Sequence, residues 1–480
     1  MAILIFTIYL LNFIFAFYLV FFRSKETSVT WAWLLCFIMV PVVGFLLYIF
    51  FGYGLKGEVF HEVNKQMKLE FEQLDLPRTS PADLYSTQAS NPENQELAEF
   101  LQNISGTPLT HHNSYTLYSD GKQKFDALKN DLRRAQDTIN IEYYAFVTDT
   151  LGMSILNILI EKAREGVRVH LLYDALGSKG VDPKKFEPLI EAGGKVEIFI
   201  TSQRSLKHFR ANYHDHHKLV IIDGQIGYIG GFNVADQYAG TTKKFGYWRD
   251  THVRLVGPIC SLLQYEFLLS WNVSVTKQRR ITLTKNLFFT YQALDLVEGN
   301  DMQLIASGPD ENKQQIKLTF IKLINSAKKR VWIQTPYLIP DDSVIDALKI
   351  AKRSGIDVRI MVPDKPDHPF IFRVTQFYAE ALIKEGIDIY SYKNGFLHSK
   401  VLIMDHDVCV VGSANQDIRS YKLNFEASAV AFSTKLNQEL TTAYENDLKK
   451  SEQWKMETFN NMSLWIKFKQ KVSRLVSPIM

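Results

Sequence analysis

The chain is 480 residues long, beyond the size at which a single hydrophobic core keeps growing, so two or more globular units are expected. With 46% hydrophobic and 22% charged residues, the composition excludes a disordered or fibrous chain. A net charge of +4 is only mildly basic, which fits an anionic partner such as an acidic lipid better than duplex DNA.

Two long uncharged stretches open the chain. Residues 2–22 carry no charged side chain and, as a helix, would be about 30 Å long, the thickness of a bilayer core. Residues 31–53 are also uncharged and follow after a short charged loop. Apolarity on nearly all faces favours membrane helices over buried core helices or a cleaved signal peptide. We therefore predict a transmembrane helical hairpin over residues 1–55, whose orientation the nearly balanced flanking charges do not fix.

A polar linker with some helix, over residues 56–111, separates this hairpin from a repeated pattern of strands and helices. In the first copy a strand, an amphipathic helix and a second strand follow one another, which is typical of a βαβ unit. The same order then returns, and an internal duplication is the economical explanation. The predicted strand, helix and strand lie at residues 139–144, 151–165 and 167–173 in the first copy and at residues 331–337, 342–354 and 358–362 in the second.

The duplication divides the remaining chain into two domains and a tail. The first domain is expected over residues 112–290 and the second over residues 291–455, each with its own copy of the motif described below. The tail, residues 456–480, mixes Trp465 and Phe468 with several lysines. This amphipathic segment fits either a surface helix on anionic lipid or a helix that packs against the second domain.

Each domain contains the same motif. A histidine is followed by a lysine two residues later, by an aspartate five residues after the lysine, and by an asparagine with a glycine three residues before it. The two sets are His216, Lys218, Asp223 and Asn233, and His398, Lys400, Asp405 and Asn415. A single histidine-lysine-aspartate pattern arises by accident roughly once in 10⁴ positions, which is weak evidence. Two copies with identical spacing, each behind a matching βαβ unit, are strong evidence for a shared function.

The residue types in this motif suit phosphoryl transfer without a metal. Side chains two residues apart in a strand share a face, so each histidine and its lysine face one pocket. Glycine permits close backbone approach, and the asparagine amide either donates to phosphate or caps a loop. If the halves meet about a pseudo-twofold axis, one histidine attacks phosphorus to form a phosphohistidine and the other acts as general acid and base. The lysines and asparagines then stabilise the charge on the equatorial oxygens.

The paired motifs resemble the HKD motifs of the phospholipase D superfamily. Longer phrases are similar to those of bacterial cardiolipin synthases, and this similarity extends over essentially the whole chain. The phrases are FGYWRDTH at residues 245–252, TPYLIP at 335–340, GFLH at 395–398 and GSANQDIRSYKLNFE at 412–426. The resemblance implies an α/β fold, a duplicated phospholipase D-like α-β-α sandwich with pseudo-twofold symmetry, here preceded by the transmembrane hairpin.

The resemblance also implies roles for individual residues. His216 matches the family's nucleophile and His398 its general acid and base. Asp250 and Glu426 are the matching candidates for a carboxylate that orients a catalytic histidine. Asp223 and Asp405 belong to the catalytic motif, but a structural role is favoured for them.

The first motif departs from the family pattern. It reads HDHHK at residues 214–218, whereas the family usually has Asn before the catalytic histidine and Arg after it. Only His216 has the correct spacing, and His214 and His217 are expected to be surface or strand-facing residues. No further ligand follows at a zinc spacing, and the three cysteines are scattered, so no metal or other cofactor is predicted and a reducing compartment is favoured.

The resemblance implies an enzyme that transfers a phosphatidyl group between two phosphatidylglycerol molecules, giving cardiolipin and glycerol. The expected location is the cell membrane, with a multi-pass anchor, catalytic domains on the cytoplasmic face and anionic membrane lipid as partner. The motif alone specifies only phosphodiester exchange. A hydrolytic phospholipase D or another phosphodiester transferase, a nuclease, and a non-enzymatic lipid-binding or scaffold protein are the alternatives. The modest charge and the predicted anchor argue against nucleic acid as a partner.

Overall fold

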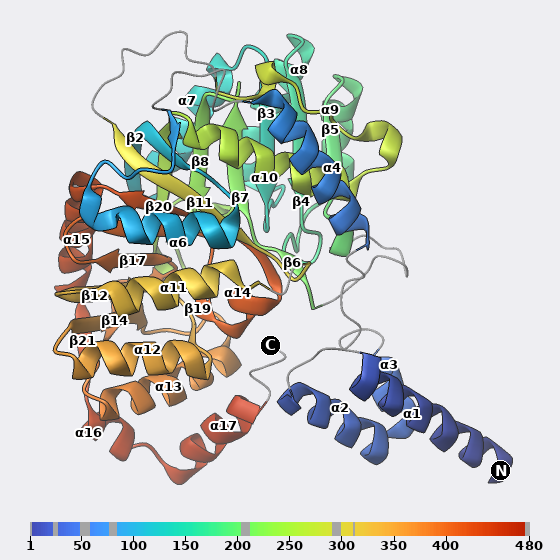
Figure 1. Cartoon of the computed structure of the whole chain (residues 1–480), viewed down its shortest axis with the longest axis vertical. Coiled ribbons are helices and arrows are strands. Elements are labelled where there is room, and N and C mark those ends of the chain that lie inside the picture. Colours follow the sequence, from blue (N-terminus) through green and yellow to red (C-terminus); the bar gives the residue numbers. More distant parts are fainter. Residues whose placement is uncertain are drawn as a thin grey trace.

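The computed structural model describes residues 2–22, 27–48, 58–75, 84–202, 212–289, 299–310 and 313–475. Figure 1 shows a large body of strands and helices, with three N-terminal helices set apart from it. These three helices are α1 (Ala2–Phe22), α2 (Thr27–Met39) and α3 (Pro41–Leu47).

The structure does not support the predicted transmembrane hairpin. Within the described ranges, no helix combines the length and the apolarity that a membrane crossing requires. The predicted loop of the hairpin, residues 23–26, and its end, residues 49–55, lie outside the described residues. Part of the predicted linker forms a helix, α4 (Glu58–Leu74), whose Phe60, Val63 and Met67 are buried in the main body.

The first half of the body is built on a mixed sheet. Three parallel strands, whose side chains are largely buried as in parallel sheets generally, continue into three antiparallel strands. In spatial order these strands are β5 (Lys195–Ile198), β4 (Arg168–Tyr173), β3 (Thr138–Tyr143), β7 (Lys218–Ile222), β8 (Ile226–Gly230) and β10 (Gly246–Val256). The helices that cover them are α7 (Gly121–Arg134), α8 (Thr150–Arg164) and α10 (Ile259–Ser274).

The second half repeats this arrangement strand for strand. Its order is β15 (Asp388–Tyr392), β14 (Asp357–Pro363), β12 (Arg330–Gln334), β17 (Val401–Met404), β18 (Val408–Gly412) and β20 (Asn424–Phe432). Its helices include α11 (Gln315–Ser326), α12 (Asp342–Arg353), α13 (Pro369–Lys384) and α15 (Thr434–Leu448). Corresponding helices begin alike, because the Asp149 carboxylate caps α8 and the Asp341 carboxylate caps α12. The predicted duplication is confirmed.

Two central strands join the halves into one continuous sheet. β2 (Leu109–Asp120) pairs with β10 of the first half and with β11 (Asn300–Ser307), and β11 pairs with β20 of the second half. The pseudo-twofold axis therefore passes between β2 and β11. Alternate residues of β7 enter different cores. Leu219 and Ile221 contribute to a core shared by both halves, and Val220 and Ile222 to a core built from the first half together with Phe396 of the second. Helices on both faces of the sheet make the predicted sandwich.

A short strand crosses from one half to the other just before each motif. β6 (His214–Asp215) pairs with the start of β20 in the second half, and β16 (Phe396–Leu397) pairs with Trp248 and Arg249 of β10 in the first half. The backbone N–H of His216 donates to the Phe425 carbonyl at 2.9 Å, and that of His398 donates to the Arg249 carbonyl at 2.7 Å. Each motif histidine is therefore held by the backbone of the opposite half.

The motif aspartates lie in the turns that follow β7 and β17, not among the residues that line the cavity described below. Asp223 has φ of 53° and Asp405 of 47°, left-handed values that aspartate tolerates better than most residues. The Asp223 carboxylate accepts hydrogen bonds from three consecutive backbone N–H groups, those of residues 136–138, at 2.9, 2.7 and 2.8 Å. Asp405 does the same for residues 328–330 at 2.8, 2.7 and 3.0 Å. Both geometries are those of structural anchors for the strand that each turn adjoins.

We predict that Asp223→Ala lowers the free energy of unfolding by about 2 kcal/mol, because it leaves three backbone donors without their acceptor. Asp223→Asn is the matched control: asparagine tolerates the left-handed conformation and keeps one acceptor oxygen, so it should cost less. Urea unfolding of both variants measures the difference. An Asp223→Ala protein that unfolds with the wild-type free energy but has lost activity would contradict the structural role.

Candidate active site

One cavity between the two halves collects four of the predicted site residues. Its volume is about 410 Å³, and His216, Asn233, His398 and Asn415 all contribute to its wall. The two histidines are 8% and 7% exposed, so their rings are nearly enclosed by protein. The convergence of the two motifs on one site, which the sequence predicts, is therefore present in the fold.

Each histidine is paired with a carboxylate from the other half. His216 Nδ1 lies 2.9 Å from both carboxylate oxygens of Glu426, and His398 Nδ1 lies 2.6 Å from Asp250 Oδ2. The register of β10 with β8 and of β20 with β18 makes Asp250 and Glu426 structurally equivalent. The candidate orienting carboxylates are thus exchanged between the halves.

Glu426 accepts several hydrogen bonds besides that of His216. The Ser420 hydroxyl donates to it at 2.7 Å and the Asn424 amide at 3.3 Å, and the Ser413 hydroxyl donates as well. Burial alone would raise the pKa of Glu426, but His216, Lys218 and Ser413 together lower it to about 2. An ionised carboxylate can only accept, so His216 carries its proton on Nδ1 and leaves the Nε2 lone pair free.

Burial also decides the charge of the two histidines. It lowers the pKa of His216 to about 3, against the opposing effect of Glu426 and with a further decrease from Lys218. Burial likewise lowers the pKa of His398, and Lys400 lowers it further. Both rings are neutral near pH 7 in the free protein, as a nucleophilic nitrogen requires.

Each motif lysine is buried and contacts the backbone of its motif histidine. The ammonium group of Lys218 donates to the carbonyl of His216 at 2.7 Å, and that of Lys400 donates to the carbonyl of His398. Burial lowers the pKa of Lys218 to about 7 and that of Lys400 to about 8. A bound phosphodiester anion would favour the charged form of both lysines, so the site is built to take up negative charge.

The two asparagines differ in their contacts. Asn233 Oδ1 accepts from the backbone N–H of Ala145 at 3.2 Å, which leaves its amide nitrogen 3.4 Å from the Tyr238 hydroxyl. The amide nitrogen of Asn415 donates to the Asp417 carboxylate at 3.1 Å. Its amide oxygen, Oδ1, has no hydrogen-bond partner among the described residues. Asn233 therefore also supports a loop, which was the alternative role.

A glycine makes room for one orienting carboxylate. A Cβ atom on Gly231 would lie 2.0 Å from Asp250 Oδ1, closer than any side chain allows. Gly231 follows β8 directly, so its lack of a side chain lets Asp250 reach His398. This is the close backbone approach that the motif glycines predict.

Sequence reasoning missed several residues of the cavity wall. Tyr144 contacts the His216 ring edge-on with centroids 5.0 Å apart, and Trp248 lies 5.3 Å from His398. Lys179, Lys244 and Arg419 add positive charge to the same wall. Trp248 and Arg419 stand inside the two longest phrases quoted above, which was a usable signal, whereas nothing local marks Tyr144, Lys179 or Lys244.

The histidines beside His216 are not surface residues. His214 lies in β6 and belongs to the cavity wall, and His217 is 1% exposed and hydrogen-bonded to Glu142 at 3.1 Å. The surface alternative is wrong for both of them, and His217 faces away into the body of the first half.

Comparison with known proteins agrees with this geometry. Residues 128–243 and 320–448 match the family model described as "Cardiolipin synthase, PLD-like domain", one segment in each half, and residues 10–52 match "Phospholipase_D-nuclease N-terminal". Among solved structures, a phosphatidylserine synthase from Haemophilus influenzae has a TM-score of 0.61 at 14% identity, covering 80% of this chain and all of that one. At that identity the likeness concerns the fold alone.

Curated relatives are similar over the full length. A cardiolipin synthase of Listeria innocua is 42% identical over 100% of this chain and 99% of its own, and the major cardiolipin synthase ClsA of Bacillus subtilis is 41% identical with the same coverage. A cardiolipin synthase of Staphylococcus aureus is 40% identical over 98% of this chain and 95% of its own. The chain therefore belongs to the cardiolipin synthase family of phospholipase D-like proteins.

Proposed function

We propose that this protein is a cardiolipin synthase that transfers a phosphatidyl group from one phosphatidylglycerol to the free hydroxyl of a second, releasing glycerol. The observation that carries the proposal is the pair of neutral, carboxylate-held histidines on one cavity, His216 with Glu426 and His398 with Asp250. Full-length relatives with this name support the choice of substrate and product.

In the first step His216 Nε2 attacks phosphorus and the glycerol alkoxide leaves with a proton from His398. His398 needs that proton beforehand, and the negative charge of the bound phosphodiester favours its protonated form. In the second step His398 takes the proton from the hydroxyl of the incoming phosphatidylglycerol. The new oxygen-phosphorus bond forms as the bond to His216 breaks, so the enzyme returns to its starting state.

The remaining motif residues support this reaction through charge. Lys218 and Lys400, both buried next to the histidines, stabilise the added negative charge on the phosphoryl oxygens in the transition state. Asn233 and Asn415 provide amide donors at the same wall. Asp250 and Glu426 act as positioning residues, because each fixes the tautomer and the ring orientation of one histidine.

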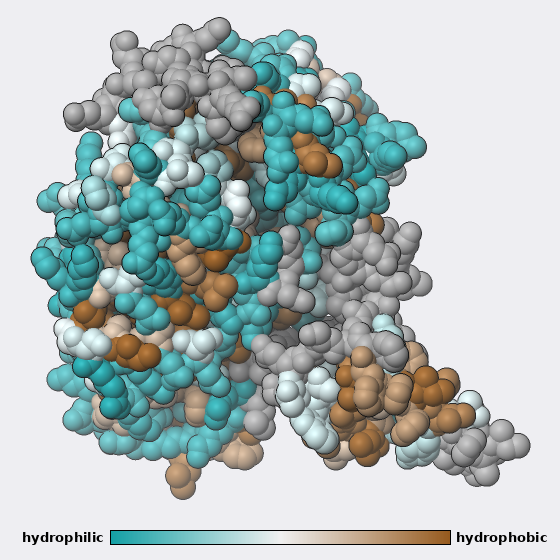
Figure 2. Space-filling view, in the orientation of Figure 1, coloured by the Kyte–Doolittle hydropathy of each residue, from teal (hydrophilic) through white to brown (hydrophobic). Residues whose placement is uncertain are grey.

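We also propose that residues 1–55 attach the enzyme to the membrane. Large apolar side chains of α1 and α2 are exposed to solvent, among them Phe13 at 70% and Ile38 at 68%, and Figure 2 shows hydrophobic residues gathered over these helices. Soluble proteins rarely leave such a surface uncovered. A hairpin that crosses twice, with the catalytic halves on the cytoplasmic face, stays a prediction from the sequence.

The C-terminal helix α17 (Leu464–Leu475) supplies a second lipid contact in this proposal. One face packs on α13, where Gln470 is buried and donates to Gln376 at 3.1 Å. The other face exposes Leu464 at 85%, Trp465 at 61% and Phe468 at 55%, interspersed with lysines. The helix therefore packs against the second domain, as one alternative has it, and the apolar and basic face that it still presents supports the other, contact with anionic lipid.

An assay of the purified full-length enzyme with phosphatidylglycerol vesicles tests the proposed reaction. We expect cardiolipin and glycerol in equal amounts from the wild type, no measurable product from His216→Ala, and a loss of about 10³-fold in His398→Ala. His406→Ala, an exposed histidine in the turn next to the second motif, is the matched control and should be fully active. Accumulation of phosphatidic acid without cardiolipin would instead identify a hydrolytic phospholipase D.

Lipid contact by α17 is tested with a polarity-sensitive fluorophore on Leu464→Cys in a Cys36→Ser background, since Cys260 and Cys409 are buried. Adding phosphatidylglycerol vesicles should shift the emission to the blue. The same label on Ile190→Cys, an exposed apolar site on α9 (Glu187–Glu191), should not respond. An unchanged spectrum at position 464 would rule out α17 as a membrane contact.

A further inference from the structure

A buried polar cluster lies behind His216 in the first half. It consists of Glu142 on β3, Asp215 on β6 and His217 at the start of β7, and one ligand atom from each lies within 4.8 Å of the others. His217 Nδ1 is 3.1 Å from Glu142 Oε1 and 3.2 Å from Asp215 Oδ1. All three side chains are at most 1% exposed.

The cluster is short of positive charge. Two buried carboxyl groups face one imidazole, and if both are ionised a protonated His217 neutralises only one of them out of contact with water. Three of its polar atoms, Glu142 Oε2, Asp215 Oδ2 and His217 Nε2, have no hydrogen-bond partner within the part of the chain that the structure describes. Unsatisfied buried atoms of this kind call for an additional bound group.

The phospholipase D-like fold does not require this cluster. The second half, which shares the strand register, has Gln334, Leu397 and Ser399 at the equivalent positions. The family usually has Asn and Arg at the positions of Asp215 and His217. With that pair, Glu142 would be the single carboxylate and would face the permanently charged Arg. The set of three potential ligands is thus a feature of this chain's first half.

We propose that Glu142, Asp215 and His217 form a binding site for a divalent transition-metal cation. In a tetrahedral zinc site with bonds of about 2.0 Å, neighbouring ligand atoms are about 3.3 Å apart, close to the two separations observed here. A doubly charged cation balances both carboxylates, with His217 bound as neutral imidazole through Nδ1. An imidazole ligand favours zinc over magnesium, which prefers oxygen ligands and keeps its waters.

A fourth residue is placed to support the histidine ligand. His217 Nε2 lies 4.0 Å from Glu266 Oε1 on α10. If Nδ1 binds the cation, Nε2 carries the proton and faces this carboxylate, the arrangement that commonly orients metal-bound histidines.

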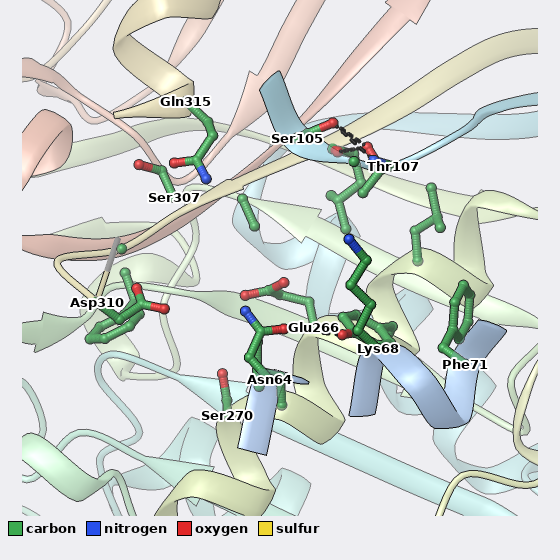
Figure 3. A pocket seen from close by; sticks show the side chains of 18 of the residues that line it. Asn64, Lys68, Phe71, Ser105, Thr107, Glu266, Ser270, Ser307, Asp310 and Gln315 are labelled. Atoms are coloured by element: carbon green, nitrogen blue, oxygen red, sulfur yellow. Dashed lines mark hydrogen bonds between the residues drawn. The ribbon is translucent and has the colours of Figure 1, made fainter. Parts of the chain in front are cut away.

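Glu266 lies between the cluster and a second cavity. This cavity, of about 250 Å³, is lined by α4, α10 and the segment around Gly308, and shares no wall residue with the cavity that holds His216. Figure 3 shows Glu266 and Ser270 at its wall together with Asn64 and Lys68 of α4. The three proposed ligands are not among its wall residues, so Glu266 is the contact through which the cluster adjoins this cavity.

The cation would act on structure, not on the phosphodiester. Asp215 pairs with Phe425 of the opposite half and precedes His216 directly. A cation that ties Asp215 to β3 would fix β6, and with it the backbone that carries His216. The inference does not depend on which phospholipid the enzyme uses.

Metal binding by the full-length protein tests the site. After removal of bound metal, we expect the wild type to take up one zinc ion per chain, measured by elemental analysis after gel filtration, with a rise in its unfolding temperature. Magnesium should produce neither effect. His216→Ala, which removes the neighbouring active-site histidine, is the matched control and should bind zinc as the wild type does.

The decisive variant is Asp215→Asn/His217→Arg, which carries the residues usual in the family and keeps a cation next to Glu142. It should fold, lose the bound zinc and lose the zinc-dependent rise in unfolding temperature. Glu142→Gln provides a second test should the double variant not fold. Wild-type protein that binds no zinc, zinc binding that survives in these variants, or zinc binding lost with His216→Ala would each overturn the proposal. The first result would identify His217 as a protonated bridge between the two carboxylates.

Discussion

The hydrogen bond between each motif histidine and a carboxylate of the opposite half is the contact on which the proposed site depends. Because His216 is paired with Glu426 and His398 with Asp250, neither half contains both members of a pair. The continuous sheet through β2 and β11 and the core shared by both halves fix the distance between these partners. The large hydrophobic interface thus serves the orientation of two imidazole rings.

The twofold relation is broken in the surroundings of the two carboxylates. Glu426 accepts hydrogen bonds from three further side chains, and its low pKa keeps His216 in one tautomer with Nε2 free. Asp250 occupies the equivalent place, but it contacts the backbone N–H of Thr251 and depends on Gly231 for space. The histidine whose carboxylate partner accepts more side-chain hydrogen bonds is the one that the family resemblance assigns as nucleophile.

The sequence predicted what depends on local spacing and left out what depends on distant contacts. The βαβ units, the duplication and both motifs follow from periodicity and spacing over short windows. The exchange of carboxylates joins residues 210 and 148 positions apart, so the sequence named Glu426 and Asp250 without pairing them with their histidines. The contact of His217 with Glu142, 75 positions away, was missed for the same reason.

The rate at which phosphohistidine forms on His216 during a single turnover with phosphatidylglycerol tests the central claim most directly. The variant is Glu426→Gln, with the exposed Glu457→Gln as its control. The account predicts a decrease of about 10²-fold in Glu426→Gln and none in the control, because the lost carboxylate of the second half orients the nucleophile of the first. Phosphohistidine formation at the wild-type rate in Glu426→Gln would contradict it.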